Sequence, residues 1–335
     1  MTIHVRKSGL LTTLQDLGRI GYQKYGVIVS GAMDSYAHRA ANLLVGNDEK
    51  EATIEMTVIG ADLYFDKPAL ISICGADFSP SIDGRSVPLW RPVYVQAGTT
   101  LRLGAARAGD RSYLAVSGGF DVPMLMDSYS TYLRAALGGY QGRALQAGDE
   151  LSVHPLHERG NQIIASMLSR CDESHMFHSV KWRISTAIMP GYETDPTIRV
   201  LPGNEYSLFD NTSLEQLWNT DYVVQSQSDR MGYRLAGERL HMLEHRELVS
   251  EPVTFGTIQV PPDGLPIILM ADRQTTGGYP RIAQVISADL PVLAQARIGS
   301  SIRFRLVDLR EAQEARLLMD LNLQSIRTSI DMYTR

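Results

Sequence analysis

The two halves of the chain carry the same short segments in the same order, and this repeat limits the folds that the chain can adopt. The offset is about 196–201 residues. The matched pairs are residues 30–34 with 228–232, 55–60 with 251–256, 73–77 with 269–272, and 97–103 with 298–304. Because order and spacing agree, we expect two similar domains, a connector and a terminal helix. The two domains are expected to cover residues 1–115 and 195–308. The connector is expected at 116–194 and the terminal helix at 309–335.

Most patterned segments are typical of β-strands. They are short, rich in Val, Ile, Leu and Tyr, and bounded by Gly, Pro, Asp or Ser. The expected strands cover residues 69–74, 92–96, 100–103, 112–117, 265–270 and 301–306. Helices are fewer: one is expected over 34–44, with Asp34 as its N-cap, and one over 309–321. The chain is therefore expected to be mainly β, a barrel or sandwich with a few helices.

Composition excludes several classes of protein. The 335 residues are 44% hydrophobic and 21% charged, enough to bury a large core. A net charge of −5 is too small to indicate a nucleic acid or a membrane surface as partner. The N-terminus has no apolar stretch of signal-peptide length, and no run of about 18 apolar residues occurs. We expect a cytoplasmic protein.

Metal and nucleotide motifs are missing from the sequence. Cys74 and Cys171 lie far apart, and His154, His157, Cys171, His175 and His178 lack the further ligands of a metal set, so no metal site is expected. There is no Gly-Lys-Ser/Thr phosphate loop and no Lys between two Met residues for biotin attachment. If ATP or biotin takes part, a partner chain is expected to carry the phosphate-binding loop or the lysine to which biotin is attached.

Polar and glycine-rich residues gather in four clusters. These are residues 12–34, 128–149, 228–232, and 250–259 together with 272–279. The triplet Gly-Gly-Tyr occurs at 138–140 and 277–279, but not at the repeat offset, so the two copies are not inherited from the repeat. Loops on a rigid scaffold often carry binding residues. Each cluster could instead be a structural turn, with Asp34 capping a helix and Met33 and Met231 filling a core.

Seven segments together resemble one known family. They are TTLQDLGRIGY, SGAMDSYAHRAANLLVGN, LAVSGGFDVP, GGYQGRAL, SDRMGYRL, SEPVTFGTIQVPPDGLPIILMADRQTTGGYP and DLPVLAQARIG. The chain resembles the family of 5-oxoprolinase C subunits, also described as allophanate hydrolase subunit 2 or KipI antagonist. That family is related to the carboxyltransferase region of biotin-dependent urea carboxylase. Departures from the family pattern are Asp127 and Tyr129, where it has Gly and Arg, and Ile28, where it has Pro.

The resemblance implies a fold, partners and an activity. The fold is two tandem cyclophilin-like β-barrels. The partners are the KipI-like B subunit and the A subunit of 5-oxoprolinase, and the complex opens 5-oxoproline to L-glutamate while hydrolysing ATP, which binds with the partner subunits. Two alternatives stay open: an antagonist that binds a KipI-like inhibitor of a sensor histidine kinase, and a carboxyltransferase subunit that uses a partner's biotin to act on urea or a similar amide.

A lactam is hard to open because its amide is stabilised by resonance. The implied reaction therefore limits the types of residue that the site needs. The site needs donors for the developing oxygen charge, a clamp for an anionic group and a proton carrier. The expected catalytic residues are Glu251, Asp272 and Tyr279. The expected substrate-binding residues are Arg19, Arg230, Gln259, Thr276, Gly277, Gly278 and Tyr140.

Overall fold

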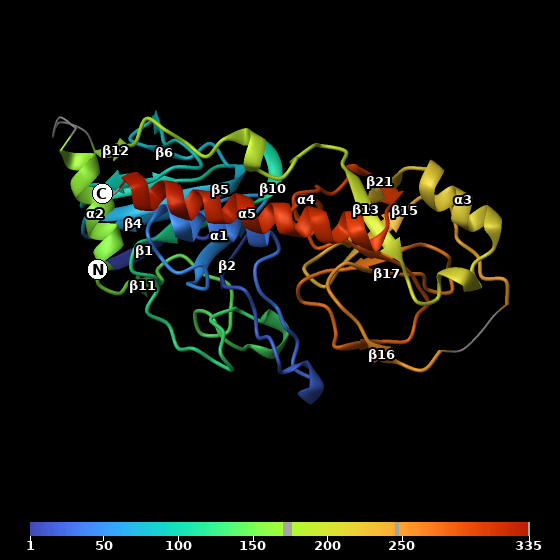
Figure 1. Ribbon diagram of the computed structural model, residues 1–335. Coiled ribbons are helices and arrows are strands. Elements are labelled where there is room, and N and C mark those ends of the chain that lie inside the picture. Colours follow the sequence, from blue (N-terminus) through green and yellow to red (C-terminus); the bar gives the residue numbers. More distant parts are fainter. Residues whose placement is uncertain (170–175, 245–247, 334–335) are drawn as a thin grey trace. The chain divides into compact units, whose positions relative to one another are not determined.

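The chain divides into two compact units. A computed structural model describes residues 1–169, 176–244 and 248–333 (Figure 1). The first unit comprises the described parts of Met1–Gly18, Asp34–Met189 and Leu321–Arg335, and the second those of Arg19–Met33 and Pro190–Asp320. Cys171 and His175 lie outside the described residues.

The first unit is built from two six-stranded sheets. One has the order β11-β1-β4-β9-β6-β7 and the other β12-β8-β5-β10-β3-β2. The strands are β1 (Thr2–Lys7), β2 (Leu11–Gln15), β3 (Thr53–Thr57), β4 (Asp62–Phe65), β5 (Ala69–Asp77), β6 (Ser81–Ile82), β7 (Arg85–Ser86), β8 (Val93–Val95), β9 (Thr99–Arg102), β10 (Ala108–Val116), β11 (Glu150–Ser152) and β12 (Phe177–Ser179). Both sheets contribute side chains to one buried core, which includes Val5 and Leu63 from the first and Ile73 and Leu114 from the second.

Strand β5 explains why its sequence is apolar almost throughout. It lies between β8 and β10, and alternate residues such as Ile71 and Ile73 enter the core between the sheets. The opposite face is covered by helix α1 (Ser35–Leu44), which packs against β5 and β10 (Figure 1). Ser72 Oγ donates to Ala41 O at 2.6 Å across that contact. A strand buried on both faces loses polar alternation and becomes a continuous apolar run.

The second unit contains a closed seven-stranded barrel in the order β13-β20-β17-β18-β15-β14-β21. The same unit also contains a separate two-stranded ribbon, β16-β19. The strands are β13 (Thr197–Pro202), β14 (Tyr222–Val224), β15 (Gly232–Ala236), β16 (Glu251–Pro252), β17 (Thr257–Gln259), β18 (Ile267–Leu269), β19 (Thr276–Gly277), β20 (Arg281–Val285) and β21 (Ser301–Leu306). The mainly β prediction is confirmed.

Helices are few in the described residues. Beside α1 they are α2 (Glu158–Leu168), α3 (Asn211–Asn219), α4 (Leu290–Ala294) and α5 (Leu309–Tyr333). Short 3-10 turns cover Gln23–Tyr25, Leu133–Ala135, Thr186–Ile188 and Tyr206–Leu208. Asp34 caps α1 as expected, because its Oδ1 accepts from Ala37 N at 2.9 Å. No helix in the described ranges combines the length and apolar character of a membrane span.

Two segments belong to different units from those expected from the repeat. Residues 116–189, expected as a connector, belong to the first unit, where β11 pairs with β1 and β12 pairs with β8. Residues 19–33, expected in the first half, belong to the second unit, and Met33 lies in the core of that unit. A sequence repeat matches short segments but does not show which unit each copy packs into, so it reveals neither the edge strands nor this exchange.

His38 makes the stability of the first unit dependent on pH. It is fully buried in α1, with Nδ1 2.8 Å from Thr53 Oγ1 and Nε2 3.0 Å from Glu49 O. Burial lowers the pKa of His38 from 6.5 to about 4. Between these pH values an unfolded chain binds a proton at His38 that the folded chain excludes, so the free energy of unfolding falls as the pH is lowered. The loss is up to about 1.4 kcal/mol per pH unit in that window.

We therefore expect H38Q to reduce the difference in stability between pH 7 and pH 4.5, because Gln does not titrate. Urea-induced unfolding at the two pH values measures this difference. H157Q is the matched control, since His157 is exposed and its replacement should leave the difference unchanged. An unchanged difference in H38Q would contradict the assignment.

Candidate functional site

Three of the four polar clusters meet in the second unit at one buried ion pair. Arg230 Nε lies 2.9 Å from Asp272 Oδ2, and Arg230 Nη2 lies 3.0 Å from Asp272 Oδ1. Ser30 Oγ donates to Asp272 Oδ1 at 2.6 Å, and Arg230 Nη2 also donates to Gly31 O at 2.7 Å. Arg230 and Asp272 are each 5% exposed. The pair thus fixes the start of the loop after β18 to two other parts of the unit.

The same loop is held at a second point by Gln23. Gln23 Nε2 donates to Val253 O at 3.0 Å and to Thr275 O at 2.8 Å. Val253 N in turn donates to Thr275 O at 3.2 Å. Residues 19–33 therefore act as a brace on the loop 272–279, although the repeat placed the two segments in different domains.

Gly277 is needed because the loop approaches Gln259 closely. Ribbon β16-β19 pairs Glu251 with Gly277, and a Cβ at Gly277 would lie 2.5 Å from Gln259 Nε2. The same Nε2 donates to Tyr279 O at 3.4 Å. Gln259 is 2% exposed, so its amide cannot move aside without disturbing the barrel. The glycine thus serves close approach to a neighbouring group.

Glu251 lies at the exposed edge of this loop. Arg281 Nη2 is 2.6 Å from Glu251 Oε2 and 2.6 Å from Glu205 Oε1. Arg281 lowers the pKa of Glu205 by hydrogen bonding. The Glu251 side chain is 55% exposed, against 14% for Glu205, so Glu251 is the carboxylate of this group that a ligand can reach.

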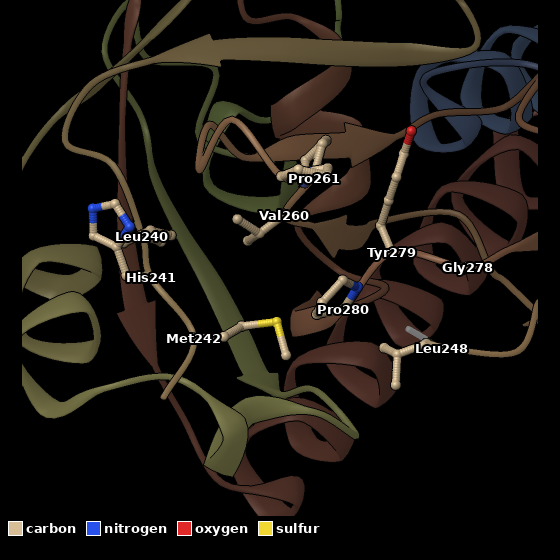
Figure 2. Close-up of a pocket in the computed structure, with 10 residues that line it drawn as sticks. Leu240, His241, Met242, Leu248, Val260, Pro261, Gly278, Tyr279 and Pro280 are labelled. Carbon is tan, nitrogen blue, oxygen red and sulfur yellow. The ribbon is translucent and has the colours of Figure 1, made fainter. Parts of the chain in front are cut away.

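The end of the loop borders a pocket of about 530 Å³. Its lining is Leu240, His241, Met242, Leu248, Val260, Pro261, Pro262, Gly278, Tyr279 and Pro280. Figure 2 shows His241, Met242, Val260 and Pro280 around the hollow, with the Tyr279 side chain extending away from Met242. Tyr279 is 46% exposed. Mostly apolar walls with a few polar groups are typical of a small-molecule site.

Tyr140 lies in the first unit, and its surroundings are described separately. Arg143 Cζ lies 5.2 Å from the centroid of the Tyr140 ring, a cation–π distance. The neighbouring loop is fixed by Asp16, whose carboxylate accepts from Ser128 Oγ at 2.7 Å and Tyr129 N at 2.6 Å. Tyr129 therefore contributes its backbone to this contact, at the position where the family pattern has Arg.

Arg19 and Thr276 complete the expected set in the second unit. Arg19 is 1% exposed, and its backbone N–H donates to Val29 O at 2.7 Å. Thr276 is exposed in β19, opposite Pro252. The structure therefore brings Glu251, Gln259, Gly277 and Tyr279 together at the loop. Among the described residues, no group of three or more His, Cys, Asp or Glu side chains is arranged to hold a metal ion.

Sequence reasoning missed Arg273, which follows Asp272 directly. Its side chain is 8% exposed and its hydrogen bonds are long: Nε to Val253 O at 3.4 Å, and Nη1 to Met270 O at 3.4 Å and Ala271 O at 3.5 Å. Burial lowers the pKa of Arg273 to about 10, and the neighbouring Asp272 opposes this shift. The only signal in the sequence is an Arg in a loop after a buried strand, which is too common to single it out.

The chain is similar along almost its whole length to two curated relatives. It is 41% identical over 319 residues to the C subunit of 5-oxoprolinase from Haemophilus influenzae, covering 95% of this chain and 96% of the relative. It is 39% identical to the C subunit of 5-oxoprolinase from Escherichia coli, covering 94% of each chain. Urea amidolyase of Saccharomyces cerevisiae is 30% identical over 97% of this chain, but the match covers only 18% of that protein.

Family and structural comparisons agree with these matches. The family described as carboxyltransferase domain, subdomain A and B, matches residues 25–306. The crystal structure of the Kluyveromyces lactis urea amidolyase has a TM-score of 0.86 at 28% identity, over 97% of this chain and 20% of that chain. The urea carboxylase of the same yeast gives the same TM-score, 0.86, over 29% of its chain.

Proposed function

The chain belongs to the carboxyltransferase domain, subdomain A and B, family, and from this premise we propose that it is the C subunit of an ATP-hydrolysing 5-oxoprolinase. The family membership confirms the resemblance inferred from the seven sequence segments. In the proposed complex a KipI-like B subunit and an A subunit join this chain in the cytoplasm. The complex opens 5-oxo-L-proline to L-glutamate.

The end-to-end match carries this proposal. The two relatives named as C subunits of 5-oxoprolinase have the same extent as this chain, with 96% and 94% of their lengths covered. Urea amidolyase matches as only 18% of a longer protein. The proposal therefore follows the two C subunits, whose names imply partner subunits. ATP is assigned to the partners' side because this sequence has no Gly-Lys-Ser/Thr loop.

The loop beside the barrel supplies the groups that lactam opening requires. In the proposal the ring lies against the segment from Thr276 to Tyr279, with Gln259 beneath it. The Tyr279 hydroxyl and backbone N–H groups of the loop donate toward the carbonyl oxygen as charge develops there. Glu251 accepts a proton from the attacking water, since its carboxylate is exposed beside the loop, and returns it to the ring nitrogen as the C–N bond of the lactam breaks. Asp272 and Arg230 act by holding the loop in place.

A carboxyltransferase that acts on urea or a similar amide is the second candidate. The structural match to urea carboxylase, with a TM-score of 0.86, favours it. It requires biotin on a partner, because no Lys between two Met residues occurs in this chain. The two candidates differ in what ATP hydrolysis requires. In the first it requires only 5-oxoproline, whereas in the second it also requires bicarbonate and a biotinylated carrier.

Reconstitution separates these candidates. The chain is co-expressed and purified with an A subunit and a KipI-like B subunit, and glutamate formation is measured with ATP and 5-oxo-L-proline. We expect ATP hydrolysis only when 5-oxoproline and all three chains are present. ATP hydrolysis that needs urea, bicarbonate and a biotinylated protein would instead support the second candidate.

In the reconstituted complex, Y279F is expected to lower kcat/KM about 10-fold or more, because it removes a donor to the developing charge. The fold should be unaffected, since the ring is retained and Tyr279 is 46% exposed. Y64F is the control: Tyr64 lies in β4 with Arg6 over its ring at 4.9 Å, a contact that Phe also makes. Equal kinetics for both variants would remove Tyr279 from the site.

A further inference from the structure

Arg273 is a buried cation with weak internal contacts. All three of its hydrogen bonds, to carbonyl oxygens of Val253, Met270 and Ala271, are 3.4–3.5 Å long, at the outer limit for such bonds. Nη2 makes no hydrogen bond to any residue that the structure describes. The side chain nevertheless keeps 8% of its surface in contact with solvent. Nη2 therefore keeps donor capacity for a molecule that arrives from solvent.

The carboxylate of the preceding residue, Asp272, is already engaged. Asp272 accepts from Arg230 through both oxygens, at 2.9 and 3.0 Å, and from Ser30 at 2.6 Å. Within the described residues Asp272 pairs with Arg230, and the Arg273 guanidinium forms no ion pair of its own. A buried charge without its own counterion is unfavourable, and an arriving anion relieves it.

We propose that Arg273 is the anion clamp of this loop and that it binds the carboxylate of a small substrate. The planar guanidinium fork matches a carboxylate with two parallel hydrogen bonds. The identity of that carboxylate as the one on the lactam rests on the function proposed above. This assigns to Arg273 the role that the sequence suggested for Arg19 or Arg230.

Position supports this role. Val253 O accepts from both Arg273 Nε and Gln23 Nε2, so the guanidinium lies next to the brace formed by residues 19–33. Val253 follows ribbon strand β16, which carries Glu251, and Thr275 precedes β19, which carries Gly277. A carboxylate held by Arg273 would therefore be anchored at the base of the ribbon whose exposed end bears Glu251.

R273M distinguishes a clamp from a structural arginine. A clamp without its own counterion contributes little to folding, so R273M should unfold at the same midpoint as the wild type or a higher one. In the reconstituted complex its KM for 5-oxo-L-proline should rise about 10- to 100-fold, the effect of losing a charge-assisted pair. R273K keeps the charge without the fork and should lie between the two. R303M is the control, because Arg303 is exposed on β21.

A binding assay on the full chain alone tests the clamp independently of the reaction. Thermal unfolding is followed with 5-oxo-L-proline, with 2-pyrrolidone, which has the lactam but no carboxylate, and with inorganic phosphate. We expect 5-oxo-L-proline to raise the midpoint of the wild type and R303M but not that of R273M, and 2-pyrrolidone to raise none of them.

The outcomes separate the clamp from the proposed function. If the complex does not open 5-oxoproline but the carboxylate still stabilises the chain through Arg273, the clamp stands and the proposed function fails. A shift that depends on Arg273 with phosphate alone overturns the carboxylate assignment. A lower unfolding midpoint for R273M, or an unchanged KM together with an unchanged ligand shift, overturns the clamp itself.

Discussion

Replacing Asp272 by Asn is expected to lower the free energy of unfolding by about 3–5 kcal/mol. The substitution leaves Arg230 charged and 5% exposed, facing a neutral amide whose NH2 group cannot accept its hydrogen bonds. Ser30 Oγ, which donates to Asp272 Oδ1, loses its charged acceptor. Urea-induced unfolding of the wild type and D272N measures the change.

Two further variants show whether the cost comes from the unpaired charge. The double variant R230M with D272L removes both charges, and we expect it to recover much of the stability lost in D272N, since an apolar pair can replace a buried ion pair at little cost. D221N breaks the exposed pair with Arg303, whose side chains are 48% and 58% exposed, and should cost less than about 1 kcal/mol. If D272N lowers the free energy of unfolding as little as D221N does, the buried pair does not hold the loop.

Elements with strong local patterns could be predicted from the sequence. The apolar run of β5, the strand at 301–306 and the N-cap at Asp34 all follow from periodicity or capping chemistry. The clearest helical pattern was expected to end at 321, but α5 continues to Tyr333, within the range 309–335 expected for the terminal helix, with Leu323, Ile326 and Ile330 buried at helical spacing. Local rules thus located elements better than their ends.

Long-range placement was beyond local rules. Met33 was expected to fill a core, and it does, but the core belongs to the second unit. The pairing of Asp272 with Arg230 joins residues 42 positions apart, and its bond to Ser30 spans 242 positions. Spacing along the chain cannot reveal such contacts. For the same reason the sequence indicated Arg230 as an anion ligand without showing that Asp272 already occupies its donors.

Replacing Gly142 by Ala is expected to destabilise the first unit by roughly 2–5 kcal/mol and to displace Tyr140. Gly142 has a φ of +68°, which strains any residue with a Cβ, and that Cβ would overlap the backbone carbonyl of Ala136. The obstacle is backbone, not a flexible side chain, so the turn closed by the bond from Gly142 N to Gly138 O at 2.8 Å must open. Strain of about 1–2 kcal/mol adds to an overpacking cost of about 1–3 kcal/mol.

G98A separates these two costs, because Gly98 has a similar φ of +77° but no atom within 4 Å of a built Cβ. It should show the strain alone, about 1–2 kcal/mol, when both variants are unfolded in urea. If Tyr140 contributes to the site, G142A should also lower the activity of the reconstituted complex under conditions where the variant is still folded, whereas G98A should not. Equal stability losses in the two variants would mean that the turn opens freely. The packing of the Gly-Gly-Tyr loop would then be too loose to position Tyr140.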